Sequence, residues 1–236
     1  MTGPARAGTA SRWTWQAGSP GPHAPPATTG RWAPGWLALA DRGRQGRAVT
    51  VIVVTGIQAA GKSTIAQALA ERLDRSVHLR GDVFRRMIVS GRAEMGPADP
   101  PAEAIAQLRL RYRLAAMAAD AYAGAGFTVV LQDIIIGSHL ADMAATIRSR
   151  PLYVVVLAPR ADVVQTRDHA RRLARGKTAY RPGDQSPAEL DAAFRRETPR
   201  IGLWLDTSAQ TVAETVEEIL GRLQAEAEVE TARPAR

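Results

Sequence analysis

The sequence predicts an α/β fold, with a five-stranded parallel sheet covered by helices on both faces. From about residue 48 onward, apolar strand-like runs alternate with helical patterns, as in chains whose parallel strands are linked by helices. Several of these runs are continuously apolar, which is typical of strands buried on both faces. A hydrophobic content of 45% is ordinary for a globular core. We therefore expect one α/β domain.

Strands and helices are expected in alternation along this domain. The strands are expected near residues 49–55, 77–80, 127–133, 152–157 and 201–205. The helices are expected near residues 62–73, 82–90, 101–125, 138–149, 160–175, 187–197 and 210–224. Two helix starts carry a capping box, Ser186 with Glu189 and Thr211 with Glu214. Open α/β sheets bind ligands at the carboxyl ends of their strands, so functional residues are expected there.

The most specific motif follows the first strand. It reads G-x-x-x-x-G-K-S-T from Gly56 to Thr64, between a buried strand and a helix, which is the context of a phosphate-binding loop. Its glycines let successive N–H groups point at a phosphate. Lys62 reaches the β- and γ-phosphates, and the Ser63 hydroxyl can bind Mg²⁺. The expected ATP-binding residues of this P-loop NTPase fold are Gly56, Gln58, Ala59, Ala60, Gly61, Lys62, Ser63 and Thr64.

The sequence lacks the motifs of several classes of P-loop protein, which argues against those classes. The sequence contains no Asn-Lys-x-Asp motif, which argues against a GTPase, and no Leu-Ser-Gly-Gly-Gln signature, which argues against a transporter ATPase. The 178 residues from 48 to 225 are few for a mechanical ATPase with its usual lid domain. A small ATP- and Mg²⁺-dependent kinase fits best.

Asp82 follows the second expected strand. A carboxylate at this strand end can face the γ-phosphate and accept a proton from an attacking hydroxyl, which contributes about 10²–10⁴-fold to the rate. The alternative is that Asp82 only caps the helix beginning at Val83. The two roles are compatible, and we expect Asp82 to be the catalytic base.

Asp133 ends the third expected strand, where P-loop enzymes hold an acid near Mg²⁺. We expect Asp133 to bind the metal together with Ser63, or else to position the acceptor. A helix cap or a structural hydrogen bond is the alternative. Gln132, its neighbour, is interpreted as a surface residue.

A row of arginines follows the fourth strand. Arg167, Arg171 and Arg175 lie four residues apart and so share one helix face. Small kinases carry such arginines on a lid that stabilises the transferring phosphoryl group. We expect Arg167 and Arg171 to do so, with the loop 176–184 closing over the substrate. The alternative is a solvated arginine face.

The acceptor is expected between the helix after Asp82 and the helix 101–125. Arg85 is the expected substrate contact on the first helix. Arg109, Tyr112 and Arg113 are further candidates on the second, although such residues usually face solvent.

Two stretches carry a family resemblance, Arg80-Gly81-Asp82-Val83-Phe84-Arg85-Arg86 and Phe127 to Gly137. They resemble the chloramphenicol phosphotransferase-like kinases. The spacing Arg80-x-Asp82-x-x-Arg85 is also similar to polynucleotide kinases and, more distantly, to zeta-type toxins. The resemblance covers about residues 49–224. It implies transfer of phosphate from ATP to a hydroxyl of an antibiotic or related metabolite, hence antibiotic resistance, with Asp82 as the base.

Two rival functions remain open. A polynucleotide 5′-hydroxyl kinase would need a basic surface on the folded domain. Residues 1–47, however, hold six arginines and one aspartate, so they carry +5 of the total charge of +8 and leave +3 for the rest. This distribution argues against a nucleic-acid partner. The second rival is a nucleotide-binding regulatory module with little transfer activity.

The chain is expected to divide into three segments. Residues 1–47, with six prolines, eight glycines and four of the five tryptophans, are expected to be a disordered leader. Residues 48–225 form the kinase domain and 226–236 a flexible tail. No signal peptide and no apolar run of the roughly 18 residues needed to cross a bilayer are found. We expect a cytoplasmic protein without a membrane partner, and the sequence leaves its oligomeric state open.

Overall fold

A parallel sheet in the order β2-β3-β1-β4-β5 forms the centre of the computed structural model, which describes residues 50–95, 100–176, 180 and 185–229. The predicted leader therefore lies outside the described residues. The strands are β1 (Val51–Thr55), β2 (Ser76–Arg80), β3 (Thr128–Gln132), β4 (Leu152–Leu157) and β5 (Leu203–Leu205). The helices are α2 (Lys62–Arg72), α3 (Asp82–Arg86), α4 (Ala102–Gly124), α5 (His139–Thr146), α6 (Ala161–Arg175), α7 (Pro187–Glu197), α8 (Val212–Arg222) and η1 (Leu223–Ala227).

The three central strands, β3, β1 and β4, are rich in valine. Strand β1 pairs in parallel with β3 on one side and with β4 on the other. Every residue of β1 and β4 is buried. Their valine-rich sequences suit a sheet that is covered on both faces, because β-branched side chains pack well on a pleated surface. This arrangement confirms the predicted fold class.

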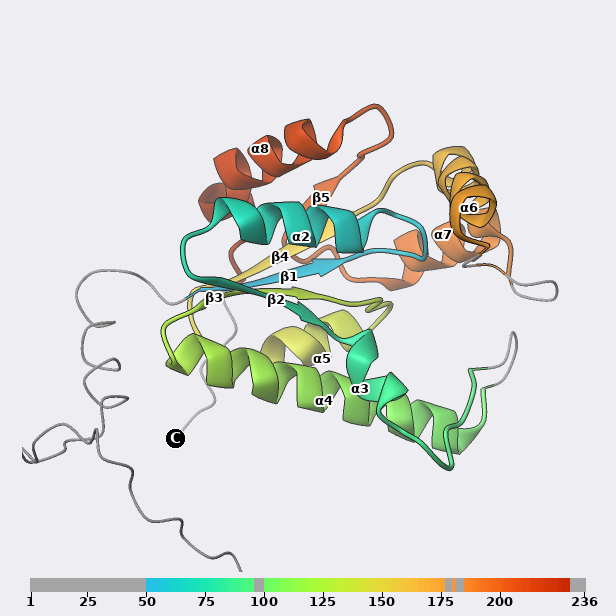
Figure 1. Ribbon diagram of the computed structural model, residues 1–236, viewed down its shortest axis with the longest axis horizontal. Helices are drawn as coiled ribbons and strands as arrows, with labels where there is room; N and C mark the ends of the chain where they lie inside the picture. Colours follow the sequence, from blue (N-terminus) through green and yellow to red (C-terminus); the bar gives the residue numbers. More distant parts are fainter. Residues whose placement is uncertain (1–49, 96–99, 177–179, 181–184, 230–236) are drawn as a thin grey trace, which may run out of the picture.

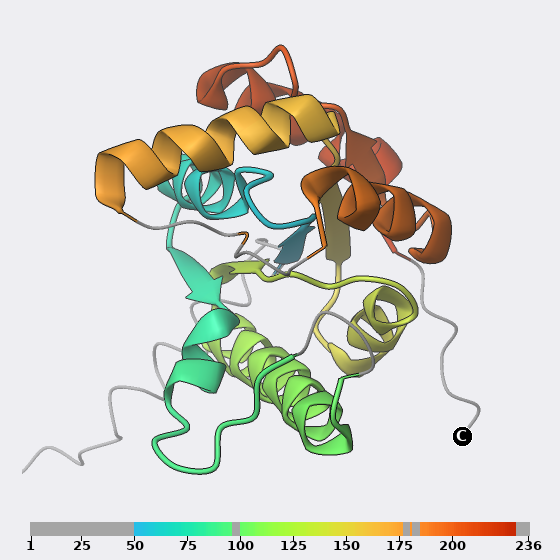
Figure 2. The ribbon, with the colours of Figure 1, turned by 90° about the vertical axis from the view of Figure 1, so that its right-hand side faces the viewer.

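Helices cover both faces of the sheet (Figure 1). Helices α2 and α8 lie on one face, and α4 and α5 lie on the other. Helix α4 approaches the strands closely because the stripe it turns toward them consists mainly of alanines. Helices α6 and α7 lie at the carboxyl ends of the strands, where the loops that follow β1, β2 and β3 also meet (Figure 2).

Both predicted capping boxes are present. The Ser186 hydroxyl accepts from the Glu189 N–H at the start of α7, and Thr211 accepts from Glu214 in the same way at α8. In both boxes the glutamate reaches back to the N–H of the capping residue.

Some predicted boundaries are wrong. The helix expected over 82–90 ends at Arg86, and the strand expected over 201–205 spans only Leu203–Leu205. The predicted flexible tail begins at 226, yet Ala227 is buried and Glu228 pairs with Tyr153 of β4. Residues 230–236 lie outside the described residues. Within the described part of the chain, no helix combines the length and the apolarity needed to cross a bilayer.

Candidate active site

The loop after β1 has the backbone of a phosphate-binding loop. Gly56 and Gly61 have φ angles of 144° and 97°, and Ala59 has 60°. A side chain at Gly56 would also place its Cβ only 2.3 Å from the carbonyl oxygen of Leu157, so this position needs glycine. The loop leads directly into α2, whose N–H groups and dipole favour an anion at the same place. The loop can therefore hold a polyphosphate.

Lys62 lies at the centre of this loop and is buried. Its ammonium group donates a hydrogen bond of 2.6 Å to the carbonyl oxygen of Ile57. Burial, followed by the charges of Arg171 and Arg111, lowers the pKa of Lys62 to about 7, against a raising effect of Asp82. Cations from α6 and from α4 thus come close to the same lysine. An anion bound in the loop would offset their repulsion.

Two side-chain oxygen atoms, from Ser63 and Gln132, lie together where Ser63 was predicted to bind Mg²⁺. The exposed Ser63 hydroxyl donates to the Oε1 atom of Gln132 over 3.3 Å. Gln132 is only 4% exposed, so its interpretation as a surface residue is wrong. Hydroxyl and amide oxygens are suitable ligands for Mg²⁺. Within the described ranges, no cluster of three histidine or acidic side chains is arranged to hold a metal.

Asp82 is the first residue of α3. Gly81 occupies the N-cap position and no side chain caps the helix, so Asp82 is not its capping residue. Its Oδ2 atom accepts from Arg86. Its Oδ1 atom is buried and has no hydrogen-bond partner among the described residues, with the Arg80 Nε atom 3.8 Å away. Asp82 therefore has one oxygen without a hydrogen bond among the described residues, and its charge acts on Lys62 of the phosphate loop.

Asp133 lies just after β3 and is engaged within the protein. The Arg111 Nε atom donates to Asp133 Oδ2 over 2.7 Å, and Arg111 Nη2 pairs with Oδ1. The N–H of Ile134 also donates to Oδ1 over 2.7 Å. A Cβ at Gly81 would lie 2.0 Å from Oδ2, so the carboxylate packs directly against this glycine. These contacts match the structural alternative for Asp133, because both of its oxygens accept hydrogen bonds from within the protein.

Arg111 lies between the residues of α4 that the sequence singled out, and was not itself among the predicted candidates. Arg109 and Arg113 are exposed. Tyr112 is buried and donates to the carbonyl oxygen of Ile134 over 2.6 Å. Burial of this hydroxyl raises the pKa of Tyr112 to about 12. The sequence did hold a signal, because Arg111 lies seven residues after the buried Ala104 and four before the buried Ala115, and so continues the apolar stripe of α4.

The predicted lid arginines lie in different surroundings. Arg167 donates to the carbonyl oxygens of Ala60, over 3.4 Å, and Thr207, over 2.8 Å, and so links the phosphate loop to the loop after β5. Arg171 is partly exposed, acts electrostatically on Lys62 and has no hydrogen-bond partner among the described residues. Arg85, the predicted substrate contact, pairs with Glu94.

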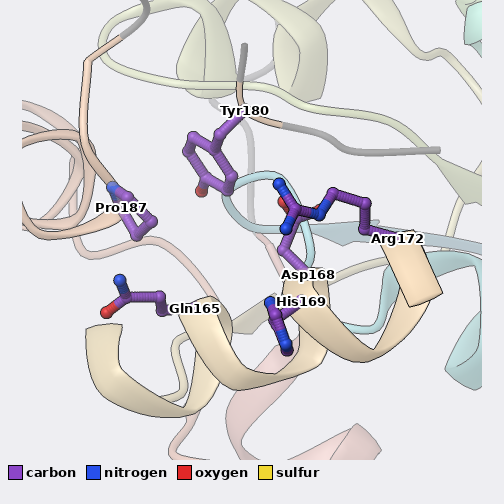
Figure 3. Close-up of a pocket in the computed structure, with 6 residues that line it drawn as sticks. All are labelled: Gln165, Asp168, His169, Arg172, Tyr180 and Pro187. Carbon is purple, nitrogen blue, oxygen red and sulfur yellow. The ribbon is translucent and has the colours of Figure 1, made fainter. Parts of the chain in front are cut away.

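The chain after α6 returns to the phosphate loop at Tyr180. Its hydroxyl donates to the carbonyl oxygen of Gln58 over 3.1 Å, and burial raises the pKa of Tyr180. The amide oxygen of Gln58 is buried without a partner among the described residues. Tyr180 also lines a cavity of about 230 Å³ between α6 and α7 (Figure 3), together with Gln165, Asp168, His169, Arg172 and Pro187. The remainder of the predicted lid loop, 177–179 and 181–184, lies outside the described residues.

Several solved structures of similar fold are described as kinases. A sugar kinase from Janibacter sp. HTCC2649 is 18% identical with a TM-score of 0.53, over 73% of this chain and 92% of the other. The APS kinase of Mycobacterium tuberculosis in complex with AMPPNP and APS is 19% identical with a TM-score of 0.53, over 75% of this chain and 98% of the other. A putative kinase from Chloroflexus aurantiacus is 23% identical with a TM-score of 0.49, over 75% and 100%. At these identities the two structures with TM-scores of 0.53 show that the fold is shared, and nothing beyond the fold.

No curated protein sequence gives a significant match. The family model AAA_33, described as an AAA domain, matches residues 51–195. This match spans more than half of the chain and includes the phosphate loop, Asp82, Asp133 and α6. The protein is thus a member of the AAA domain family AAA_33.

Proposed function

We propose that this protein is an ATP- and Mg²⁺-dependent kinase that transfers the γ-phosphate to a hydroxyl group of a small molecule. The observation that carries the proposal is the placement of Asp82 beside the phosphate loop, with a buried Oδ1 atom that lacks a hydrogen-bond partner among the described residues and a charge that acts on Lys62. Two proteins of similar fold, a sugar kinase and an APS kinase, agree with this proposal.

The reaction needs one proton transfer and one phosphoryl transfer. The Asp82 carboxylate accepts the proton of the acceptor hydroxyl. The acceptor oxygen forms a bond to the γ-phosphorus while the bond from that phosphorus to the β–γ bridging oxygen breaks, and ADP leaves. A base positioned in this way contributes about 10²–10⁴-fold.

Positive charge on the protein stabilises the moving phosphoryl group. Lys62 and the N–H groups of the loop bind the β- and γ-phosphates, and Arg171 approaches from α6. Ser63, with Gln132 beside it, would hold Mg²⁺, which supplies further charge neutralisation. Arg167 is assigned to the nucleotide side, where it keeps the phosphate loop and the loop after β5 together.

The acceptor is assigned to the space beside α3 and the first half of α4. Arg85 of α3 is the proposed contact to the substrate. Large apolar side chains in this region are exposed: Met87 by 64%, Met95 by 48% and Leu110 by 40%. They suit an acceptor with an apolar portion, such as the antibiotic or nucleoside-like metabolite that the resemblance to chloramphenicol phosphotransferase-like kinases implies.

A screen of acceptors tests this function. The full chain is incubated with Mg·ATP and a panel of hydroxyl-bearing antibiotics, nucleosides, sugars and 5′-hydroxyl oligonucleotides, and products are identified by mass. We expect the wild type to add a single phosphate to one of the small molecules. The Lys62→Ala variant should phosphorylate none of them. Phosphate on the oligonucleotides instead would identify a polynucleotide kinase. ATP binding without transfer to any acceptor would favour the regulatory module.

A further inference from the structure

We propose that Arg111 contacts the transferring phosphoryl group and that Asp133 positions Arg111 for this contact. The inference rests on the proposed kinase function. It adds an arginine that comes from α4, on the acceptor side of the sheet, whereas the lid arginines expected from the sequence come from α6 on the other side (Figure 2). One cation from each side would then meet the phosphoryl group.

The pairing with Asp133 fixes the plane of the Arg111 guanidinium. The carboxylate engages the Nε and Nη2 edge of the group. A guanidinium has five N–H groups, and this pairing uses one on each of the two nitrogens. The other three have no partner among the described residues. A planar fork with free N–H groups suits the equatorial oxygens of a phosphoryl group.

Arg111 also lies close to the residues proposed to bind the phosphates and to accept the proton. Its positive charge lowers the pKa of Lys62, which binds the phosphates, and the charge of Asp82 acts in turn on Arg111. Arg111 is thus near both the lysine of the phosphate loop and the proposed base. Its side chain is only 12% exposed, and burial lowers the pKa of its guanidinium. A cation held out of water interacts strongly with charge that develops on a transferring group.

Contacts on both sides of the pair hold it rigidly. The Asp133 carboxylate accepts the N–H of Ile134 and packs against Gly81, which has no side chain to displace it. Tyr112, the residue after Arg111, ties α4 to the carbonyl oxygen of Ile134. Such preorganisation lets a charged group stabilise a transition state without rearranging during the reaction.

Three other arginines near the site already have partners. Arg167 donates to the carbonyl oxygens of two loops, Arg85 pairs with Glu94, and Arg86 pairs with Asp82. Arg111 therefore joins Arg171 as a cation that is close to Lys62 and retains N–H groups for a phosphoryl oxygen.

Kinetics of the Arg111→Ala variant test the contact. The readout is the kcat for ATP hydrolysis by the full chain, with water as the acceptor, and for transfer to any acceptor that the screen identifies. We expect kcat to fall by about 10²–10³-fold, while ADP affinity stays within about two-fold of the wild type. Arg111→Lys, which keeps the charge but loses the fork, should give an intermediate kcat. Arg148→Gln, an exposed arginine after α5, serves as the matched control.

Chemical rescue separates a contact from a structural role. Guanidinium ion in solution should restore part of the kcat of Arg111→Ala but none of the kcat of Asp82→Asn. A kcat of Arg111→Ala close to that of the wild type overturns the proposal. So does a fall in kcat that comes with an equal loss of ADP affinity and that guanidinium does not restore. A wild-type protein that fails to bind ADP would instead end the proposed function, and this inference with it.

A double variant tests the role of Asp133. If Asp133 acts through Arg111, Asp133→Asn should lower kcat in the wild-type background and have no further effect in Arg111→Ala. Additive losses in the double variant would show that Asp133 does not act by positioning Arg111, and would overturn that half of the proposal.

Discussion

The Lys62 ammonium group donates a 2.6 Å hydrogen bond to the carbonyl oxygen of Ile57, so the phosphate loop closes on its own lysine. The lysine is buried, and the charges of Arg171 and Arg111 add to the burial in lowering its pKa to about 7. A buried cation beside other cations destabilises the fold. The phosphates of a nucleotide would place negative charge beside these cations. The free energy of nucleotide binding is therefore more favourable than the hydrogen bonds of the loop alone would make it.

Replacing Lys62 by methionine should therefore separate stability from binding. The Lys62→Met variant removes a desolvated charge and keeps most of the volume, so we expect the free energy of unfolding at pH 7 to rise by about 0.5–2 kcal/mol. Its affinity for ADP should fall at least about ten-fold, because the β-phosphate loses its cation. Thermal unfolding and calorimetric titration measure the two effects. A variant that is less stable than the wild type would show that the ammonium group holds the loop together.

The Tyr112 hydroxyl should make folding sensitive to alkaline pH. In the fold its pKa is about 12, against an ordinary value of 10, so the native state keeps the proton more tightly than the unfolded chain. The stabilisation of the fold that comes from this raised pKa is fully present below pH 10 and is lost as the pH rises through 12. Near neutral pH, Tyr112→Phe should cost about 1 kcal/mol for the hydrogen bond to Ile134.

Near pH 12 the Tyr112→Phe variant should become the more stable protein. The wild type loses about 2 kcal/mol of its free energy of unfolding through ionisation of Tyr112, and the variant has no hydroxyl to ionise. Denaturant unfolding of both proteins from pH 8 to 12 measures the difference. A difference that stays constant across this range would contradict the assignment.

Much of the fold could be read from the sequence because its signals are local. The valine-rich runs predict the three buried strands, and the boxes at Ser186 and Thr211 predict the starts of two helices. Boundaries that depend on tertiary contact were predicted less well. The strand that ends at Leu205 is an edge strand with one neighbour, and it pairs over only three residues.

The residues of the candidate site also differ in how far local sequence marks them. The phosphate loop is a contiguous motif, and Asp82 stands next to a strand end, so both could be selected as candidates from the sequence. Arg111 and Asp133 are 22 residues apart, and their pairing depends on how α4 docks on β3. The partners of Arg167 are backbone carbonyls in two loops, which no residue type marks in the sequence.

A methyl group added at Gly81 should disturb the Asp133–Arg111 pair. Its Cβ would lie 2.0 Å from the Asp133 carboxylate, so Gly81→Ala forces Asp133 to move. We expect a loss of about 1–3 kcal/mol in the free energy of unfolding, together with a fall in ATP hydrolysis. Gly124→Ala is the control, because the new Cβ meets nothing within 4 Å at the end of α4 and alanine is the better helix former. Equal stability of the two variants would contradict the tight packing at Gly81.

The Mg²⁺ requirement should depend on Ser63 and on the residue that faces it. Ser63→Ala should raise the Mg²⁺ concentration for half-maximal ATP hydrolysis by about ten-fold or more. Gln132→Ala should shift the same midpoint in the same direction but less, because Gln132 is bonded to the Ser63 hydroxyl. Gln67→Ala, on the exposed surface of α2, provides the control. Mg²⁺ titrations of hydrolysis that superimpose for all the proteins would exclude this metal position.

Asp82→Asn tests the proposed base most directly. On the same preparations of wild type and variant, the affinity for ATP is measured alongside the rate at which the γ-phosphate leaves Mg·ATP in the presence of the acceptor panel. We predict equal affinities, with transfer by the variant slower by about 10²-fold or more. Transfer at the wild-type rate by Asp82→Asn would contradict the account, because the proton of the acceptor would then leave by another route.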